Sequence, residues 1–265
     1  MNSTVTVLAS SLRVCALTAI GCLAVAFAQQ QEKYKHPAAD PNHDLTTKEF
    51  FTDLGANFKG LVSVESVAPV LVGGAAYSIA TIPEQRIQAH FAPGDVWGRW
   101  STPGEYIGHP FVLGGISATM FAFSRKSEDR RFRSLSYALV QGMFMSAAIV
   151  EPTKLAVRRW RPDNNNRASF PSGHSTESFM FATVFAEHYG WKVAVPAYAI
   201  ASYVAMTRLE ERKHHITDVV AGAAIGYLVG HTLSRRMRNG PAKKATWQIY
   251  PSGLGFVGAV SIQLP

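Results

Sequence analysis

The stretch DVVAGAAIGYLVG, residues 218–230, has the length and composition of a helix that packs closely against a neighbour. Gly222, Gly226 and Gly230 are spaced by four residues, so they lie along one face of such a helix. A face without side chains lets the backbone of a second helix approach closely. Because membrane bundles and tight soluble bundles both use such faces, the stretch predicts a helical core but not its surroundings.

Five further apolar stretches, rich in Ala, Gly and Val, precede the last one. The six stretches cover residues 66–82, 110–124, 134–150, 178–185, 193–207 and 219–233. Most have the length of helices rather than strands. The sequence therefore predicts an all-α fold, a compact helical bundle of about six core helices within residues 60–240.

The N-terminal residues 1–28 have the features of a secretory signal peptide. Arg13 precedes an apolar run over residues 14–28, and Ala26-Phe27-Ala28 fits a cleavage site. Both cysteines, Cys15 and Cys22, fall in this segment. We expect cleavage and export of a chain without cysteines, and an uncleaved membrane anchor is the alternative.

Two smaller segments flank the expected bundle. Residues 29–59 predict an exposed leader with a short amphipathic helix, because apolar residues recur at helical spacing after a capping residue at Thr46 or Thr47. In the tail, residues 241–265, apolar and polar residues alternate from Val260 to Leu264. This alternation, with a turn at residues 251–253, predicts a short C-terminal β-hairpin.

The chain is basic, with 26 Lys and Arg residues against 18 Asp and Glu residues. This balance favours anionic partners such as phosphates or acidic lipid surfaces. The basic residues form no long run, and no aromatic-interleaved strand motif accompanies them, so we expect no nucleic-acid binding.

Three short blocks carry residues suited to phosphate chemistry. They are KLAVRRWRP at 154–162, PSGH at 171–174 and TRLEERKHHITD at 207–218. In the first block Lys154 and Arg161 are seven residues apart, which predicts one shared face of a helix that Pro162 ends. Arg158 and Arg159 are interpreted as ordinary helix-end cations.

The blocks together predict a site for one phosphate group. Lys154, Arg161 and Arg208 supply positive charge, and arginine matches phosphate oxygens in a bidentate way. Ser172 offers a hydroxyl, and Gly173 lets the backbone approach an oxyanion where a helix begins. Such a turn can hold phosphate oxygens, and His174, the residue that follows the turn, would lie beside them.

A second histidine completes the expected site. His214 and Asp218 are four residues apart, so a helix beginning near His214 would place them on one face. The Asp218 carboxylate could then accept the N–H of one ring nitrogen of His214. The other nitrogen would be left free as a nucleophile. Of the remaining histidines, His215 is interpreted as a neighbour of the site and His109 as structural.

The three blocks resemble the signature of the type 2 phosphatidic acid phosphatase and haloperoxidase superfamily. That signature is Lys, six residues, Arg-Pro; then Pro-Ser-Gly-His; then Ser-Arg, five residues, His, three residues, Asp. Ten of its positions match in order within residues 154–218. Thr207 replaces the usual Ser, and its hydroxyl can still donate a hydrogen bond.

The resemblance implies a metal-independent phosphatase that acts on phosphomonoesters or lipid phosphates. It implies that His214 attacks phosphorus and forms a phosphohistidine, that Asp218 orients His214, and that His174 protonates the leaving oxygen. It assigns the phosphoryl oxygens to Lys154, Arg161, Ser172, Gly173 and Arg208. The residues alone do not choose among phosphatidate, polyprenyl pyrophosphate, lipid A phosphate and small soluble esters.

Two other functions fit parts of the pattern. A vanadium-dependent haloperoxidase would hold vanadate in the same cradle, because vanadate copies the phosphoryl transition state. A non-catalytic envelope protein could bind anionic lipid through its basic residues. The complete set of acid, nucleophile and orienting residues favours the phosphatase.

The sequence makes conflicting predictions about membrane topology. The segment RKSEDRRFR, residues 125–133, carries five basic residues and is expected in the cytoplasm by the positive-inside rule. Three predictions exclude one another: cleavage after Ala28, six helices that each span the membrane, and a cytoplasmic basic segment. At most two of the three can be true. The longest apolar stretch has 17 residues and the mean hydropathy is +0.03, which favours helices that do not cross. We therefore expect an exported, periplasmic or membrane-associated protein with its site outside the cytoplasm, and a multi-pass inner-membrane protein is the alternative.

Overall fold

The computed structural model describes residues 36–40, 42–92, 97–239, 245–252 and 255–262. The expected signal peptide, residues 1–28, lies outside the described residues. Within them the α-helices are α2 (Thr47–Gly60), α3 (Val67–Thr81), α4 (Glu84–His90), α5 (Thr102–Ile107), α6 (Pro110–Ser124), α7 (Arg130–Val157), α8 (Gly173–Tyr189), α9 (Trp191–Glu210) and α10 (Ile216–Asn239). Three short 3₁₀ turns are η1 (Pro37–Ala39), η2 (Val64–Ser66) and η3 (Gly98–Trp100).

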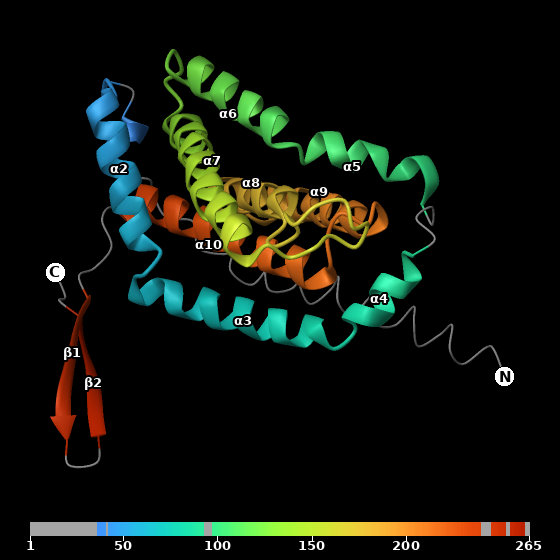
Figure 1. Ribbon diagram of the computed structural model, residues 1–265. Coiled ribbons are helices and arrows are strands. Elements are labelled where there is room, and N and C mark those ends of the chain that lie inside the picture. The colour runs from blue at the N-terminus through green and yellow to red at the C-terminus, as the bar shows by residue number, and fades with distance from the viewer. Residues whose placement is uncertain (1–35, 41, 93–96, 240–244, 253–254, 263–265) are drawn as a thin grey trace.

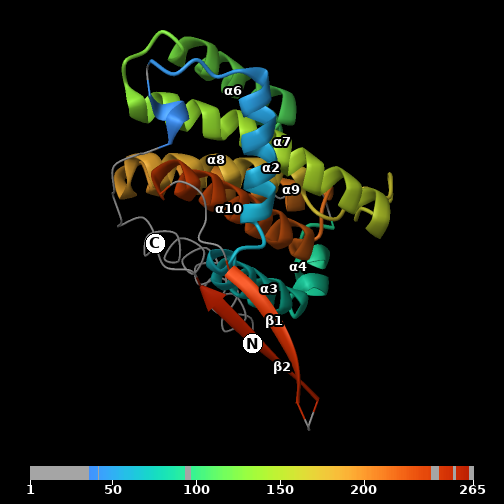
Figure 2. The same ribbon diagram turned by 90° about the vertical axis from the view of Figure 1, so that its left-hand side faces the viewer.

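The predicted all-α bundle is confirmed, because the six apolar stretches fall in α3 and in α6 to α10. The longer helices form layers in the order α6, α7, α8, α10 and α3, and α2 crosses this stack (Figure 2). Helices α5 and α6 run along one side of the bundle and α3 along the opposite side (Figure 1). The two short helices α4 and α5 contain no long apolar run and were not predicted.

The glycine face of α10 packs against α8. A Cβ atom on Gly222 would lie 2.5 Å from the Ser172 carbonyl oxygen, and one on Gly226 would overlap the Thr176 carbonyl oxygen. Gly230 continues this face, because its Cβ would lie 2.9 Å from the Met180 carbonyl oxygen. The backbones of α8 and α10 therefore touch along three helical turns.

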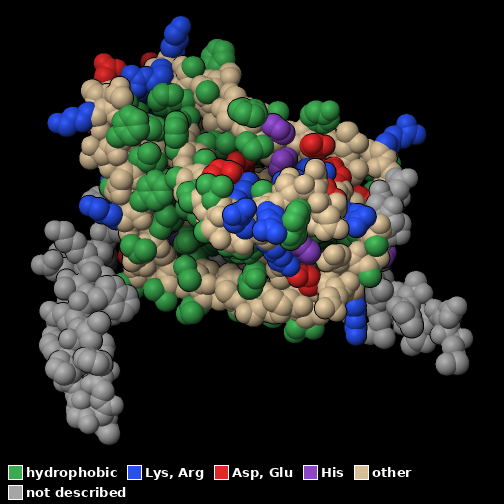
Figure 3. Space-filling model, viewed as in Figure 1, with side chains coloured by type: hydrophobic (Ala, Val, Ile, Leu, Met, Phe, Trp, Pro, Cys, Tyr) green, Lys and Arg blue, Asp and Glu red, His purple; other side chains and the backbone are tan. Residues whose placement is uncertain are grey.

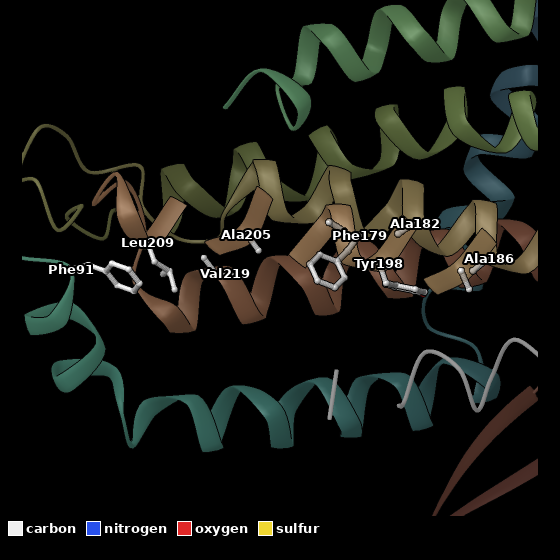
Figure 4. Packing of buried hydrophobic residues seen from close by; sticks show 10 residues of the cluster. Phe91, Phe179, Ala182, Ala186, Tyr198, Ala205, Leu209 and Val219 are labelled. Carbon is white, nitrogen blue, oxygen red and sulfur yellow. The ribbon is translucent and has the colours of Figure 1, made fainter. Parts of the chain in front are cut away.

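A core of small and aromatic residues fills the space between α8 and α9 and extends to Val219 of α10. Phe179 and Tyr198 pack among Ala182, Ala186 and Ala205, and these side chains come from α8 and α9 (Figure 4). Because alanine occupies so many of the facing positions, α9 approaches α8 closely along its length.

The amphipathic helix expected before residue 60 is α2. Thr46 caps it with a capping box in which the Thr46 hydroxyl accepts from the Glu49 N–H and the Glu49 side chain accepts from the Thr46 N–H. Leu54 and Phe58 pack on the cluster that includes α7 and α8. Residues 36–39 fall in the leader that we expected to be exposed. Ala38 and Ala39 are nevertheless buried, because this segment docks on the end of α10 through the His36 N–H and the Met237 carbonyl oxygen, 2.9 Å apart.

The tail forms the expected hairpin, with β1 (Ala245–Ser252) antiparallel to β2 (Gly255–Ile262). Pro251 and Ser252, which we expected in the turn, are the last residues of β1 instead. Pro251 pairs with Phe256 across the hairpin.

Two helical segments of the described residues are long and apolar enough to cross a membrane. They are Val64–Thr81 and Ile216–Asn239, and a third would be Gly98–Ile107 with Pro110–Ser124 if that bent pair forms one span. The apolar stretches in the sequence are shorter than these helices, because η2 extends α3 and polar residues extend α10. The short stretches therefore underestimate the length of helix available to a bilayer.

We predict that Gly226→Ala destabilises the fold. The added methyl group would collide with the Thr176 carbonyl oxygen and with the Met180 backbone nitrogen, 2.9 Å away, so α8 and α10 must separate. Overpacking of this kind costs about 1–3 kcal/mol of the free energy of unfolding, measured by denaturant or thermal unfolding.

Gly115→Ala in α6 is the matched control, because a Cβ atom there has no neighbouring heavy atom within 4 Å. It exchanges helical Gly for Ala without a collision, so it is expected to stabilise by up to about 1 kcal/mol. Equal effects of the two substitutions would show that close α8–α10 packing does not limit stability.

Candidate active site

The first block leaves its helix earlier than the sequence predicts. Helix α7 ends at Val157, and Arg158 adopts a left-handed conformation with φ of 51° while its N–H donates to the Lys154 carbonyl oxygen at 3.0 Å. This cap turns the chain away from the helix axis. The prediction that Lys154 and Arg161 share one helix face is therefore wrong, because Arg161 lies in the loop after the helix.

Lys154 lies over the start of α8. Its Nζ is 3.5 Å from the position that a Cβ atom on Gly173 would occupy, and it forms an ion pair with Glu151 at 2.7 Å. The Lys154 ammonium group therefore lies beside the first turn of α8.

The second block forms the N-terminus of α8, as the sequence predicts. Ser172 is the N-cap and Gly173 is the first helical residue. The Ser172 hydroxyl oxygen accepts from the Ser175 N–H at 3.4 Å and from the Ser175 hydroxyl at 3.1 Å. Because Ser172 is the acceptor in both contacts, its own proton stays available to a ligand.

Arg208 lies at the other end of the site, in the last turn of α9. Its guanidinium donates to Glu211 at 2.9 Å and to the Thr207 hydroxyl at 3.2 Å. The Thr207 hydroxyl in turn donates to the Val204 carbonyl oxygen at 2.7 Å. Thr207 therefore orients Arg208 through its hydroxyl, and its methyl group faces Gly104 of α5, where a Cβ atom would lie 2.6 Å from that methyl.

His174 projects from the first turn of α8 towards the junction of α5 and α6. Its ring lies edge-on to the ring of His109, with centroids 5.8 Å apart, and its Cδ2 would be 3.2 Å from a Cβ atom on Gly108. Its Nε2 is buried and has no hydrogen-bond partner among the described residues. We interpreted His109 as structural, and it proves to be a neighbour of the site.

The surroundings of His174 disfavour its protonated form. Burial lowers its pKa to about 3, and the nearby charges of Arg208, His109 and Lys154 act in the same direction, against a hydrogen bond with the Glu105 backbone. In the free protein His174 is therefore neutral near pH 7, and an anion among these cations would favour its protonation.

His214 is buried just before α10, with 5% of its surface exposed. Its Nδ1 lies 2.6 Å from the Ser169 carbonyl oxygen. A carbonyl can only accept, so Nδ1 carries the proton and Nε2 keeps its lone pair. Burial and the charge of Arg161 hold the pKa of His214 well below its usual value, so the ring is neutral.

The contact predicted between Asp218 and His214 is absent from this arrangement. The Asp218 Oδ2 is 4.0 Å from the His214 Nδ1, too far for a hydrogen bond. The reason is that α10 begins at Ile216, two residues after His214, so the two residues are not one helical turn apart. The Asp218 Oδ2 instead accepts from the Ser169 hydroxyl at 2.5 Å and from the His215 N–H at 2.8 Å.

The side chains of the three blocks converge on one region. The charges of Arg161, His174 and Lys154 all act on His214, and those of Arg161 and Glu211 act on Arg208. The Arg161 Nε is buried and has no hydrogen-bond partner among the described residues. On the face viewed in Figure 3, basic side chains gather beside histidines and acidic side chains. Cations and unpartnered N–H groups gathered in this way suit a tetrahedral oxyanion.

Two residues of this region were missed as functional candidates. Ser169 bonds both His214 and Asp218, and Arg159 donates to the Asp218 Oδ1 at 2.7 Å. Arg159 was interpreted as an ordinary helix-end cation, and the loop after α7 instead carries it to the buried carboxylate. Within the described residues, no group of three or more His, Cys, Asp or Glu side chains is arranged to hold a metal ion.

A comparison with known families places these blocks. Residues 135–240 match the PAP2 superfamily, and all three blocks lie inside this range. We refer to residues 135–240, the range that matches this family, as the PAP2 domain. The resemblance drawn from the ten motif positions is thereby confirmed, and α4, α5 and α6 lie outside the matched range.

Several known proteins are similar to part of this chain. The chain is 32% identical over 115 residues to a lipid A 1-phosphatase of Porphyromonas gingivalis, covering 42% of this chain and 26% of the relative. It is 31% identical over 91 residues to a lipid A 4'-phosphatase of Helicobacter pylori, covering 34% of this chain and 43% of the relative. The chain thus spans less than half the length of either relative.

A solved structure also aligns with the chain. It is the crystal structure of a transmembrane PAP2 type phosphatidylglycerolphosphate phosphatase from Bacillus subtilis. The two are 19% identical with a TM-score of 0.38, and the alignment covers 71% of this chain and 94% of that chain.

We predict that binding of inorganic phosphate takes up a proton through His174. The bound anion offsets the charges of Arg208 and Lys154, so the pKa of His174 rises from about 3 in the free protein. Protonation then favours binding, and phosphate affinity falls as the pH rises through the pKa of the complex. Calorimetry in buffers of different ionisation enthalpy measures the protons taken up.

His174→Gln is the control, because it keeps a polar side chain that does not titrate. The variant is expected to take up about one proton fewer per phosphate than the wild type at a pH between the free and bound pKa values. Equal proton uptake by the two proteins would exclude His174 as the titrating group.

Proposed function

We propose that the protein is a phosphatase that hydrolyses lipid phosphates or other phosphomonoesters through a phosphohistidine at His214. The observation that carries this proposal is the state of His214. Its Nδ1–H is held by the Ser169 carbonyl oxygen, so its neutral Nε2 is the free ring nitrogen in a region of fixed cations. A buried neutral imidazole of this kind is a nucleophile rather than a charged phosphate ligand.

The first step exchanges one bond to phosphorus for another. The His214 Nε2 attacks phosphorus, the bond to the ester oxygen breaks, and His174 gives its proton to the departing oxygen. Lys154, Arg161 and Arg208 neutralise the charge on the phosphoryl oxygens, together with the N-terminus of α8. In the second step neutral His174 takes a proton from water, the oxygen of that water attacks phosphorus, and phosphate leaves His214.

The same three cations support a reaction without a metal ion. Phosphoryl transfer depends mainly on positioning and on neutralising the equatorial oxygens. Two arginines and a lysine can supply that charge from fixed positions. We therefore propose that no cofactor is required, and that vanadate inhibits by occupying the phosphoryl position.

A lipid phosphate is the substrate class that we favour. The Porphyromonas and Helicobacter relatives both act on lipid A by name, and this chain is similar to them over 115 and 91 residues. Only eight residues separate Pro162 from Pro171, so the loop between the first two blocks is too short for an inserted recognition domain. Selection of the ester is left to the helix ends and to the α5–α6 junction.

Exposed apolar side chains support a place in the membrane. Only 11% of the segment Val64–Thr81 is buried, and its exposed side chains include Val70, Leu71 and Ile79. On the opposite side of the bundle Phe111 of α6 is 86% exposed. Apolar surface on two sides of a helical bundle is unfavourable in water and suits a bilayer.

The charge distribution supports a site outside the cytoplasm. The basic segment 125–133 lies at the start of α7 and Lys154 near its end, and a helix of 28 residues is about 42 Å long. If the basic segment is cytoplasmic, the site lies at the opposite surface. Asp44 forms an ion pair with Arg125 at 3.1 Å, so the leader lies at the basic end. The leader and the site would then lie on opposite sides, which is incompatible with export of the leader after cleavage.

We predict hydrolysis of a chromogenic phosphate ester without added metal, with inhibition by vanadate. His214→Ala is expected to lower kcat by at least about 10³-fold, because the nucleophile is lost. Acid-quenched wild-type protein incubated with labelled substrate should carry phosphate on His214.

Thr207→Ser is the matched control, because it keeps the hydroxyl that bonds Arg208 and should retain activity. Full activity in His214→Ala, together with loss of activity on chelation, would replace this mechanism with a metal-dependent one. Halide-dependent peroxide activity with vanadate would assign the site to the haloperoxidase alternative.

We also predict that the site and the leader face opposite sides of a membrane. Single cysteines at Lys48→Cys and Asn165→Cys, in a chain without Cys15 and Cys22, can be labelled in spheroplasts with an impermeant maleimide. Both positions are exposed, so differences report sidedness. We expect labelling at residue 165 alone until the membrane is permeabilised. Labelling at both positions, or release of the protein by salt, would contradict the spanning arrangement.

A further inference from the structure

Arg159 holds two carboxylates at once. One guanidinium nitrogen donates to the Asp218 Oδ1 at 2.7 Å and to the Thr217 hydroxyl at 2.6 Å. The other donates to the Glu84 Oε1 at 2.5 Å. The Asp218 side chain is fully buried, whereas those of Arg159 and Glu84 are 26% and 20% exposed. Arg159 thus neutralises the buried Asp218 carboxylate, and it is itself held in place by the more exposed Glu84 carboxylate.

The anchoring carboxylate comes from a different part of the chain. Glu84 is the first residue of α4 and precedes the PAP2 domain by some fifty residues. Its Oε2 accepts from the Thr217 N–H at 3.3 Å and from the Thr217 hydroxyl. Burial alone would raise the pKa of Glu84, but the Thr217 hydrogen bond and the Arg159 charge outweigh it and lower the pKa. Glu84 is therefore ionised and holds both Arg159 and the start of α10.

Ser169 joins this ion pair to the nucleophile. Its N–H donates to the Arg159 carbonyl oxygen at 3.1 Å, and its hydroxyl donates to the Asp218 Oδ2 at 2.5 Å. Its carbonyl oxygen then accepts the His214 Nδ1–H at 2.6 Å. Every polar group of Ser169 is thus used, so the place of its carbonyl oxygen is set by Arg159 and Asp218.

We propose that Glu84 is a positioning residue that fixes the His214 imidazole through Arg159, Asp218 and Ser169. This inference rests on the proposed function, because it concerns the nucleophile of that reaction. It assigns part of the catalytic geometry to α4, an element outside the PAP2 domain.

The physical argument concerns which oxygen of Asp218 is free to bond Ser169. With Glu84 in place, the guanidinium is held on the Oδ1 side of Asp218, and Oδ2 is left to Ser169 and to the His215 N–H. Without that anchor Arg159 can shift onto both oxygens of Asp218, since bidentate contact is its preferred geometry. Ser169 would then lose its partner, and His214 would lose the fixed orientation of its ring.

Other contacts of α4 lie beside the same segment. The Gln88 side-chain oxygen is 3.0 Å from the His215 Nδ1. A small pocket between α4 and the nucleophile is lined by Ile87, Phe91 and His214. Helix α4 therefore covers the back of His214, which gives Glu84 a rigid support.

The test compares Glu84→Gln with Glu65→Gln. Glu65 forms a similar ion pair with Arg235 of α10 at 2.7 Å, and the two side chains are 22% and 25% exposed. Both substitutions remove one carboxylate that ties an earlier segment to α10, but Arg235 lies far along α10 from His214. A purely structural role predicts the same behaviour for both variants.

We expect Glu84→Gln to lower kcat about tenfold with KM unchanged, the size typical of residues that orient a reacting group indirectly. Formation of the phosphohistidine in rapid-quench experiments should slow by the same factor, while the loss of Tm matches that of Glu65→Gln. A kcat equal to that of Glu65→Gln would overturn the inference while leaving the proposed function intact. An inactive wild-type protein would overturn the proposed function itself.

Arg159→Lys provides a second route if Glu84→Gln does not fold. It keeps a positive charge beside Asp218 but cannot bridge both carboxylates. It should therefore also lower kcat and leave KM unchanged. In a folded double variant the two losses should not add, because they break one chain of contacts. Additive losses, or an unchanged kcat in Arg159→Lys, would show that Glu84 does not act through Arg159.

Discussion

The close contact between the backbones of α8 and α10 determines where the residues of the site lie. Gly222 and Gly226 let α10 approach so closely that a methyl group on either would overlap α8 carbonyl oxygens. At the end of this contact the Ser172 N–H donates to the Asp218 carbonyl oxygen at 3.0 Å. The N-terminus of α8 and the start of α10 are thereby fixed side by side. His174 and His214, forty residues apart in the chain, face one region because two helices share a surface without side chains.

The sequence was sufficient to predict the helices and the three blocks that the fold brings together. Apolar stretches of helical length and fixed motif spacings are local features of the sequence. They can be interpreted without knowledge of the tertiary structure. It was insufficient for the contacts within the site. Arg158 takes a left-handed conformation that no spacing rule anticipates, so Arg161 leaves the helix. Asp218 contacts Ser169, and Ser169 contacts His214, because the position of α10 relative to the loop before α8 is a tertiary property.

Elements outside the PAP2 domain complete the site, and their sequences gave no sign of it. Gly104 and Gly108 in α5 and just after it are ordinary in sequence, yet they make room for Thr207 and His174. In the sequence nothing distinguishes Glu84 from the other acidic residues. Its contact with Arg159 arises only from the position of α4 in the fold. Such residues carry no motif because their role depends on where a short helix docks. If Glu84 has the role proposed for it, related PAP2 domains with different flanking segments need not position the corresponding histidine in the same way.

In the proposed mechanism, the cations that bind the phosphate also control when His174 can donate a proton. Without an anion, burial and the charges of Arg208, His109 and Lys154 keep His174 neutral, so it has no proton to give. A phosphate dianion removes that obstacle, because its charge offsets those of the cations. In that mechanism phosphate binding creates the acid that the first step needs. Transfer of the proton to the departing alcohol oxygen then leaves neutral His174 as the base for the second step. A neutral lipid in the same region would meet an unprotonated His174, so we propose that selection for phosphate arises from electrostatics as well as from shape.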